Sequence, residues 1–486
     1  MPPNAQTHPK KLLFALLIPL FMALVAVSVV NVALTPIGSS LGASSSQTQW
    51  VVSGYALAFG VPLVAAGRIG DATGRRRVFI IGIAFFTVGS LLSGLAPNAA
   101  LLIAARVLQG LGAGFLNPQT TGIIQQNFSG QSRARAYGMF GTTVALAVIV
   151  GPVLGGFLLK IFGDSLGWRM MFLLNVPIGL LGIILALRWI PADRAQLAAT
   201  KDTATTASAT PVRKRLDLDP VGMVSLAVAT FALLLPFVQR TFTPASWVIL
   251  AAGIVLVLFF VWWENRYKRA GKPPMLDMDL LKEPAFRNGI LIVTLYFLGN
   301  TSVWLVIPIY VQSHLHGSAL LAALIGVPSA LLSAFAAPWA GKRVLAAGRR
   351  MMLVGFSFSM LAIASTLVLI TWVDNGTLPV WTLAFPLSLL GIGGGLTISP
   401  NQTLTLKSMP PEVSGVAGAV MSLGQRMGTA VGTALIPSIM FGLVEAGYHW
   451  NIGFIAAFSA IFLMLAAGLF FTVMDRRREV REDARA

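Results

Sequence analysis

The stretch Leu12–Pro36 reads LLFALLIPLFMALVAVSVVNVALTP and contains no charged side chain in its 25 residues. A helix needs about 20 apolar residues to cross the hydrocarbon core of a bilayer, so this stretch is long enough to span a membrane. Similar stretches recur along the 486-residue chain, which is 56% hydrophobic and 11% charged. Soluble domains carry about 25% charged residues. The composition therefore predicts an all-α polytopic membrane protein.

Fourteen apolar stretches are predicted to cross the membrane. The first is too long for a signal peptide and no cleavage site follows it, so we expect it to be retained. The spans are Leu12–Pro36, Trp50–Ile69, Val78–Leu95, Ala99–Thr120, Ala136–Leu159, Met170–Leu187, Pro220–Val238, Trp247–Trp263, Gly289–Val311, Ala319–Ala340, Met351–Val373, Pro379–Pro400, Val416–Leu443 and Ile452–Met474. They divide the chain into an N-terminus (1–11), an N-terminal six-helix bundle (12–190), a loop (191–219), two inserted helices (220–263), a linker (264–288), a C-terminal six-helix bundle (289–474) and a basic tail (475–486).

The basic residues lie mostly on one side of this arrangement. The chain has 35 Lys and Arg against 17 Asp and Glu, a net charge of +18. The loops opposite the termini carry only Lys160, Arg169 and Arg240. The positive-inside rule then predicts a multi-pass protein of the cell inner (plasma) membrane with both termini in the cytoplasm. Because these charges set topology, no nucleic-acid partner is expected. The loops on the side of the termini carry Arg75–Arg77, Arg133, Arg135, Arg213–Arg215, Lys268, Arg269, Lys342, Arg343, Arg349, Arg350 and Lys407.

Residues that support enzyme or metal chemistry are scarce. The chain has no cysteine, and its four histidines are scattered along the sequence, so no metal site is expected. A nucleotide-binding loop, a His-Glu-x-x-His motif and an intramembrane Asp pair are absent, and the longest loop (191–219) is too short for a catalytic domain. The sequence therefore predicts a protein that is not an enzyme and needs no cofactor. The histidines are His8, His314, His316 and His449.

Two loops between spans share a pattern. The first reads Gly67-Arg-Ile-Gly-Asp71-Ala-Thr-Gly74-Arg75-Arg76, and the second, between spans ten and eleven, reads Gly341-Lys-Arg-Val-Leu345-Ala-Ala-Gly348-Arg349-Arg350. Short loops between spans are often rich in Gly and Arg, which leaves a chance likeness open. Taken with the span count, the repeat predicts two pseudo-symmetric six-helix bundles around a central cavity, an arrangement suited to alternating access.

These loops and several further motifs resemble the major facilitator superfamily, and within it the fourteen-span drug:proton antiporter branch of multidrug efflux transporters. The first loop matches the signature Gly-x-x-x-Asp-x-x-Gly-Arg-Arg/Lys. Span four has Arg106-Val-Leu-Gln109-Gly110, which is similar to Arg-x-x-Gln-Gly, and span five has Gly151-Pro152-Val-Leu-Gly155-Gly156, which resembles the antiporter motif. The resemblance implies a cofactor-free antiporter that works as a monomer in the lipid bilayer on small hydrophobic or amphiphilic substrates and on protons.

The first loop is the predicted gate. Asp71 ends span two, where its carboxylate can accept hydrogen bonds from the first turn of a neighbouring helix and pair with Arg75. Such contacts form a breakable lock on the cytoplasmic face, and a solvated carboxylate that only helps topology is the alternative. Because Leu345 replaces the acid in the second loop, any lock is asymmetric. The gating residues are Gly67, Asp71, Gly74, Arg75 and Arg76.

Small residues on one face of span five predict an antiporter-type hinge at Gly151, Pro152, Gly155 and Gly156. Proline removes a backbone hydrogen bond, and glycine permits close helix contact. Ordinary packing of small residues would give the same pattern, so the motif says little about the substrate.

Two arginines, Arg106 and Arg426, lie inside apolar spans. An intramembrane charge is costly and normally faces a polar interior or a partner. Snorkelling to the surface is the alternative, and it is harder for Arg426, which is near the middle of its span. Other polar and aromatic residues are expected to line the substrate cavity, with helix–helix packing as the alternative for each. They are Asn31, Gln109, Asn117, Asn300, Trp304 and Gln425.

Carboxylates are missing from the span interiors. The drug antiporter branch usually has an Asp five positions before the Asn of Asn31-Val-Ala-Leu34, where this chain has Ala26. A buried carboxylate is the usual proton carrier of such a pump. Proton coupling must then use the substrate's own proton or a peripheral acid, namely Asp71, Asp374 or Glu445. A cavity that holds two arginines without carboxylates favours anionic, zwitterionic or neutral amphiphiles.

The leading interpretation is a secondary active transporter that exports hydrophobic drugs or amphiphilic metabolites, exchanges them for protons by alternating access, and contributes to antibiotic resistance. The alternative is an exporter or flippase of an anionic or zwitterionic lipid or metabolite without conventional proton coupling.

Overall fold

The computed structural model describes residues 9–192, 218–239, 243–407 and 409–483, and throughout these ranges its regular elements are helices. Before the inserted pair come α1 (Pro9–Ser28), α2 (Val30–Leu41), α3 (Ser45–Gly60), α4 (Leu63–Thr73), α5 (Arg75–Leu95), α6 (Ala99–Asn127), α7 (Gly130–Leu173) and α8 (Asn175–Trp189). The inserted pair is α10 (Pro220–Gln239) and α11 (Pro244–Arg269). After it come η1 (Met278–Lys282), α12 (Pro284–Ser313), α13 (Ala319–Ala347), α14 (Arg350–Asp374), η2 (Val380–Leu383), α15 (Ala384–Lys407), η3 (Pro411–Val413), α16 (Ser414–Glu445) and α17 (Trp450–Asp483).

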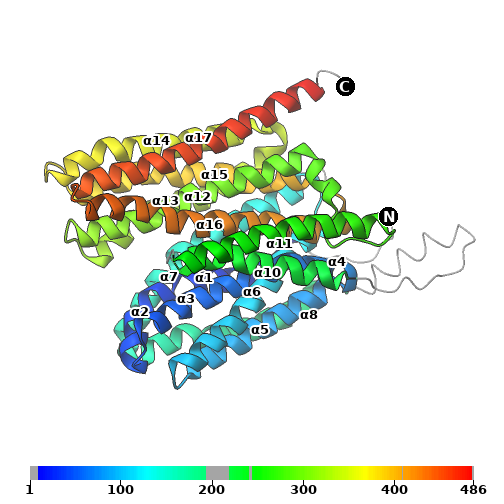
Figure 1. Ribbon diagram of the computed structural model, residues 1–486, viewed down its shortest axis with the longest axis horizontal. Helices are drawn as coiled ribbons and strands as arrows, with labels where there is room; N and C mark the ends of the chain where they lie inside the picture. Colours follow the sequence, from blue (N-terminus) through cyan, green and yellow to red (C-terminus); the bar gives the residue numbers. More distant parts are fainter. Residues whose placement is uncertain (1–8, 193–217, 240–242, 408, 484–486) are drawn as a thin grey trace, which may run out of the picture.

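The helices form two bundles that lie side by side with their axes in roughly the same direction (Figure 1). Helices α1 to α8, blue to cyan, form the first bundle, and α12 to α17, yellow-green to red, form the second. Helix α10 packs against both α3 and α16, and α11 packs on α10. Buried contacts among Leu57, Leu234 and Ala430 join these three helices. The predicted all-helical membrane architecture is confirmed at this level.

Twelve helices in the described part of the chain are long and apolar enough to cross a bilayer. A thirteenth span results when α3 and α4, which meet at 41°, are taken as one bent span. The predicted second span is thus divided into two helices next to Pro62, which has no backbone N–H to donate. The predicted first span is also divided, at Val29 between α1 and α2, and α2 continues beyond Pro36 to Leu41.

Several helices run past the ends of the predicted spans. Helix α17 extends to Asp483, so residues 475–483 of the predicted tail are helical, and α11 extends to Arg269. Helices α7 and α8 are separated only by Leu174, and inside α7 the helical geometry is interrupted at Gly163, with φ 71° and ψ 175°. The predicted terminus 1–8, most of the predicted loop (193–217), Arg240 and residues 484–486 lie outside the described residues.

Three glycines bring α16 into close contact with α12. An added Cβ would lie 2.6 Å from Thr294 Oγ1 at Gly424, 2.2 Å from the Thr294 carbonyl oxygen at Gly428 and 2.1 Å from the Leu298 carbonyl oxygen at Gly432. The three positions repeat every four residues, so they share one face of α16. Small residues at this spacing let two membrane helices approach at the backbone.

Replacing Gly428 by Ala is expected to destabilise the protein by about 1–3 kcal/mol, because the new methyl group overlaps the backbone of α12 and that helix must move. Gly442 lies on the same helix, and a Cβ there meets no atom within 4 Å. Gly442→Ala is therefore the matched control, and it should be neutral or slightly stabilising because Ala has the higher helix propensity. Thermal unfolding of both variants in one detergent measures the difference. Equal midpoints would contradict the prediction.

We call the end of the bundles that carries Arg75, Arg133, Lys342 and Arg349 the basic end. Helix α17 ends at this end, on the right in Figure 1. Within the described ranges, the hydrogen bonds between the first and second bundles come from the half of the helices nearest the basic end. They join Gln125 to Leu406, Gln131 to Gly341 and Lys342, Thr142 to Ala334, Gln402 to Thr121, Ser422 to Asn117, and Asp71 to Gly415 and Val416. The two bundles are therefore closed against each other at the basic end.

Candidate functional site

Asp71 connects the two bundles at the basic end. Its Oδ1 accepts a hydrogen bond from the Gly415 N–H at 3.2 Å, and its Oδ2 accepts one from the Val416 N–H at 3.0 Å. Both donors belong to the first turn of α16, where N–H groups lack helical partners and the helix dipole favours a negative charge. Arg75 Nη2 lies 2.6 Å from Asp71 Oδ1, and both side chains are only 3% exposed. One carboxylate therefore pairs within its own bundle and caps a helix of the other.

The rest of the first loop holds Asp71 in place. Arg75 Nη1 donates to the Gly122 carbonyl of α6 at 2.6 Å. Gly74, between α4 and α5, has a φ of 115°, a backbone conformation that glycine adopts readily and other residues avoid. An added Cβ at Gly67 would lie 2.8 Å from the Gly415 carbonyl oxygen, so α4 and α16 touch there at the backbone. Arg76 instead donates to the Leu187 carbonyl of α8, inside the first bundle.

The second loop makes its ion pair within one bundle. Arg349 Nε lies 2.6 Å from Asp475 Oδ2, and both side chains are 5% exposed. Arg349 Nη1 also donates to Asn401 Oδ1 at 3.4 Å. The second loop has Leu345 where the first has Asp71, and Asp475 of α17 supplies the carboxylate instead. The two loops therefore differ in their contacts as well as in sequence, because among the described residues Asp71 of the first loop contacts the other bundle, whereas Asp475 pairs with Arg349 within its own bundle.

The predicted hinge residues divide into two groups. An added Cβ at Gly151 would lie 1.9 Å from Ser28 Oγ, and one at Gly155 would lie 3.2 Å from Val29 Cγ2. Ser28 Oγ also donates to the Ala147 carbonyl at 3.0 Å. Gly151 and Gly155 therefore seat α7 against the break between α1 and α2. Pro152 lies inside α7, and a Cβ at Gly156 would meet nothing within 4 Å.

Arg106 is held inside the first bundle and is only 1% exposed, so it does not snorkel to the surface. Its guanidinium donates to the Val51 carbonyl at 3.0 Å, to Gln109 Oε1 at 2.5 Å and to the Ala26 carbonyl at 3.4 Å. It also stacks over the Tyr55 ring at 4.1 Å. Arg106 therefore joins α6 to α3 and, through the Ala26 carbonyl, to α1.

Arg426 has a different environment. It is half-buried in α16, and its guanidinium carbon lies 3.8 Å from the centre of the Phe59 ring of α3. Among the described residues, no carboxylate or hydrogen-bond acceptor contacts this guanidinium. A guanidinium carries five N–H donors. Arg426 therefore presents a mid-span positive charge, with its donors unused, where α16 faces the first bundle.

The other predicted cavity residues are not gathered in one cluster. Gln109 is buried and donates to Ser90 Oγ at 2.6 Å, and Asn117 accepts a hydrogen bond from Ser422 Oγ across the bundles at 2.9 Å. Trp304 packs against Gly326, where an added Cβ would lie 3.0 Å from its ring. Asn31 is exposed on α2, and Asn300 and Gln425 are half-buried.

Sequence reasoning missed a pair of buried acids where α10 begins and α11 ends. Asp219 and Glu264 are 0% and 1% exposed, and an added Cβ at Gly222 would lie 2.4 Å from an oxygen of each. Trp263 Nε1 donates to Asp219 Oδ1 at 2.9 Å, and the Leu276 N–H donates to Glu264 Oε2 at 3.2 Å. The two carboxyl groups are therefore buried next to each other.

The linker after α11 places these acids near the Asp71 contact. Leu276 and Met275 pack in one apolar cluster with Val64 of α4 and Val416 of α16, next to the Asp71 contact. The linker is further held by Lys268, which pairs with Asp277 at 2.7 Å and with Asp279. Hydrogen bonding to Lys268 and Lys282 lowers the pKa of Asp279 to about 2.

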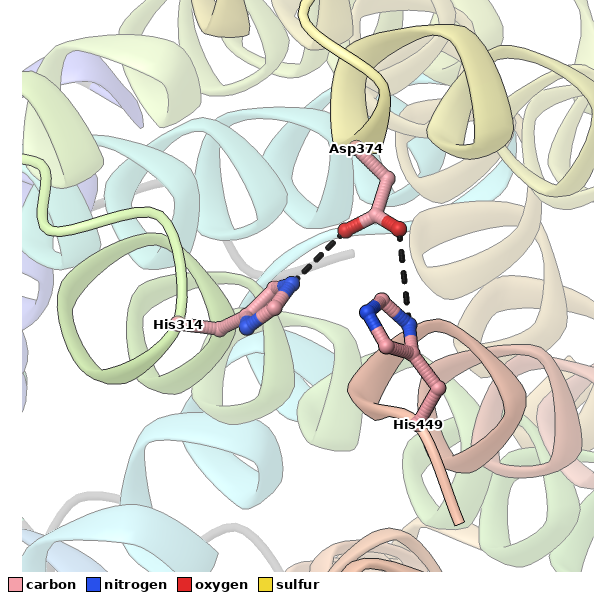
Figure 2. Close-up of side chains that lie close together, drawn as sticks. All are labelled: His314, Asp374 and His449. Atoms are coloured by element: carbon pink, nitrogen blue, oxygen red, sulfur yellow. Dashed lines mark hydrogen bonds and ion pairs between the residues drawn. The ribbon is translucent and has the colours of Figure 1, made fainter.

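The expectation of scattered histidines is wrong for two of the four. His314 and His449 both approach Asp374, at 2.7 Å and 3.5 Å, at the end of the second bundle opposite the basic end (Figure 2). His316 is exposed and takes no part in this cluster, and His8 lies outside the described residues. The three residues come from separate helix ends, so no local spacing in the sequence could have revealed them.

Two helical bundles joined at one end through the Gly67–Arg76 loop define a membrane transporter of the two-bundle class. The chain belongs to the Major Facilitator Superfamily, whose family model matches residues 16–433.

Proteins similar in sequence confirm the predicted resemblance of the chain to the drug-efflux branch of this superfamily. The chain is 32% identical over 421 residues to the probable actinorhodin transporter of Streptomyces coelicolor, covering 86% of this chain and 70% of that protein. It is 28% identical over 435 residues to the multidrug resistance protein Stp of Mycobacterium tuberculosis, covering 88% and 75%. Among solved structures, the proton:xylose symporter XylE shares the fold with a TM-score of 0.68 at 12% identity, over 97% of this chain and 96% of that one.

Proposed function

We propose that the protein is a monomeric fourteen-span exporter of hydrophobic drugs or amphiphilic metabolites in the cell inner membrane. It needs no cofactor and is not an enzyme. Helices α7 and α8 together cover the 60 residues Gly130–Trp189, which as helix have a summed length of about 90 Å, roughly three times the thickness of a bilayer core. Divided near Gly163, this stretch supplies two spans instead of one. The even count puts both termini on the side of the basic loops, which the positive-inside rule assigns to the cytoplasm.

The observation that carries the proposal is the contact of Asp71 with the first turn of α16. With this contact formed, the basic end is shut, so the described conformation is closed toward the cytoplasm. Alternating access requires the same contact to break when the bundles rock. An ion pair and two hydrogen bonds suit a contact that must form and break in each cycle.

Proton exchange is the proposed driving force, and we assign the proton to Asp219 and Glu264. They are buried, they lie beside each other, and their linker packs against α4 and α16 near Asp71. A change of charge at this pair would act on the gate through that packing. Asp71, Asp374 and Glu445, the peripheral acids expected from the sequence, remain the alternatives to be compared with them.

The second candidate function is export of an anionic or zwitterionic lipid or metabolite without proton coupling. The unpaired guanidinium of Arg426 favours it, because this charge would bind an acidic group of the substrate and repel a cation.

Efflux from proteoliposomes, with and without an imposed pH gradient, separates the two functions. For the antiporter, the gradient should accelerate export of a cationic dye about 10-fold in the wild type and in Glu445→Gln, and the acceleration should be lost in Glu264→Gln. Gradient-independent movement of anionic lipid analogues, with no cation export, would replace the antiporter by the second function. Equal acceleration in Glu264→Gln would remove the assigned proton site.

A further inference from the structure

Three helix ends meet at His314, Asp374 and His449. His314 is the C-cap residue of α12, Asp374 is the last residue of α14, and His449 directly precedes α17. His314 Nε2 lies 2.7 Å from Asp374 Oδ1, and His449 Nδ1 lies 3.5 Å from Asp374 Oδ2. One ligand atom from each residue lies within 4.8 Å of the other two. The two imidazoles approach the carboxylate from different sides, each facing its own oxygen (Figure 2).

Neighbouring side chains hold two of the three residues in position. Tyr310 Oη donates to Asp374 Oδ1 at 2.6 Å. The His314 ring stacks on Trp450 with a centroid distance of 5.6 Å and an interplanar angle of 11°. The side chains of Asp374 and His314 are 5% and 20% exposed, whereas that of His449 is 60% exposed. The potential metal ligands Asp374 and His314 are therefore held in place by their neighbours. The third, His449, lies at the surface, where an ion from solution can enter.

Two imidazole nitrogens and one carboxylate oxygen are a donor set that suits zinc and neighbouring divalent transition metals. Zinc holds such atoms at about 2.0–2.2 Å in a tetrahedron, which separates any two of them by about 3.3 Å. The distances of 2.7 Å and 3.5 Å lie on either side of this value, so small side-chain rotations, largest for the exposed His449, bring the three atoms to this spacing. The hydrogen bond from Tyr310 provides the outer-shell support that metal-bound carboxylates normally have.

We propose that His314 Nε2, one Asp374 oxygen and His449 Nδ1 bind a divalent transition-metal ion of the zinc class, with water in the fourth position. On binding, His449 Nδ1 gives up the 3.3 Å hydrogen bond that it accepts from the Asn451 N–H. All three ligands belong to the second bundle. The ion therefore ties α12, α14 and α17 together and stiffens that bundle, and it makes no link between the two bundles. The site lies at the end opposite the Asp71 contact, and the proposed metal site does not rest on the transport function proposed above.

The test is metal binding by the full-length, tag-free protein in detergent after treatment with a chelator. Titration calorimetry with Zn²⁺ should show one equivalent per chain, Co²⁺ should produce the visible absorption of a tetrahedral complex, and Zn²⁺ should raise the thermal midpoint. His449→Ala removes an exposed ligand, so its metal-free midpoint should match the wild type. Its zinc affinity should fall by more than the roughly 10–100-fold that loss of an outer-shell partner causes. Tyr310→Phe should show that smaller, 10–100-fold loss.

The matched control is His316, two residues from His314, exposed and with a φ of 53°. Asn tolerates this left-handed conformation, so His316→Asn removes a surface imidazole without backbone strain. This variant should bind zinc like the wild type. Absence of binding by the wild type, unchanged binding by His449→Ala, or loss of binding in His316→Asn would each overturn the proposal.

Discussion

Asp71→Asn is expected to open the basic end and to reduce export by about 10–100-fold. The substitution keeps the shape of the side chain but removes the charge that α16 and Arg75 bind. Hydrogen bonds to a charged group contribute about 1.5–3 kcal/mol each, so the loss of even one shifts the balance between closed and open conformations by about 10–150-fold. Arg75 would also remain buried beside a neutral amide in place of a carboxylate, which adds to the cost of the closed form.

The change in the closed–open balance can be measured with spin labels attached to introduced cysteines. The chain has no cysteine of its own, so only the introduced positions are labelled. Spin labels at Ser132 on α7 and Lys342 on α13 flank the junction of the two bundles, and both positions are exposed. The distribution of distances between the labels should move to longer values in Asp71→Asn.

Asp475→Asn is the matched control. Asp475 pairs with Arg349 at the same distance, 2.6 Å, and is similarly buried, but that pair lies within the second bundle. This variant should lower the thermal midpoint and leave the label distances unchanged. An equal opening in both variants, or none in Asp71→Asn, would show that the gate does not depend on the acid that crosses between bundles.

The first loop shows how far sequence reasoning reaches. Asp71 and Arg75 are four residues apart at a helix end, so their pairing follows from local geometry. The partner in the other bundle, the first turn of α16, lies 344 and 345 positions away, and only the packing of two bundles brings it there. In the second loop, Leu345 predicts that the two loops differ, because the acid of the first is missing. It does not predict that Asp475 pairs with Arg349, because no periodic pattern in the sequence connects these two residues.

The buried polar groups show the limit of reasoning from one helix at a time. Arg106 and Arg426 look alike in the sequence, each a charge inside an apolar span. Only tertiary contacts distinguish Arg106, whose donors meet carbonyls of α1 and α3, from Arg426. The Asp374 cluster was missed for the same reason, since its three residues come from three separate helix ends.

Arg426→Gln is expected to lower the export of anionic amphiphiles by about 10–150-fold with little change in stability. The guanidinium already lacks an acceptor among the described residues, so its removal leaves no group of the protein unpaired. The loss is the roughly 1.5–3 kcal/mol that a charge-assisted hydrogen bond to the substrate would contribute. Arg106→Gln should instead reduce stability more than it changes substrate selectivity. It strands buried acceptors on Val51 and Gln109, so a loss of stability of about 3 kcal/mol should dominate.

The ratio of anion to cation export isolates the charge effect from any loss of active protein, because both rates come from the same proteoliposomes. Arg426→Gln should lower the ratio of anion to cation export by the same factor of about 10–150, since a positive charge that attracts anions also repels cations. Arg106→Gln should lower both rates together and leave the ratio near that of the wild type. If Arg426→Gln exports anionic and ethidium-like cationic dyes in the wild-type ratio, the charge of Arg426 does not select the substrate. Recognition would then rest on the apolar and aromatic surfaces around Phe59 and Trp304.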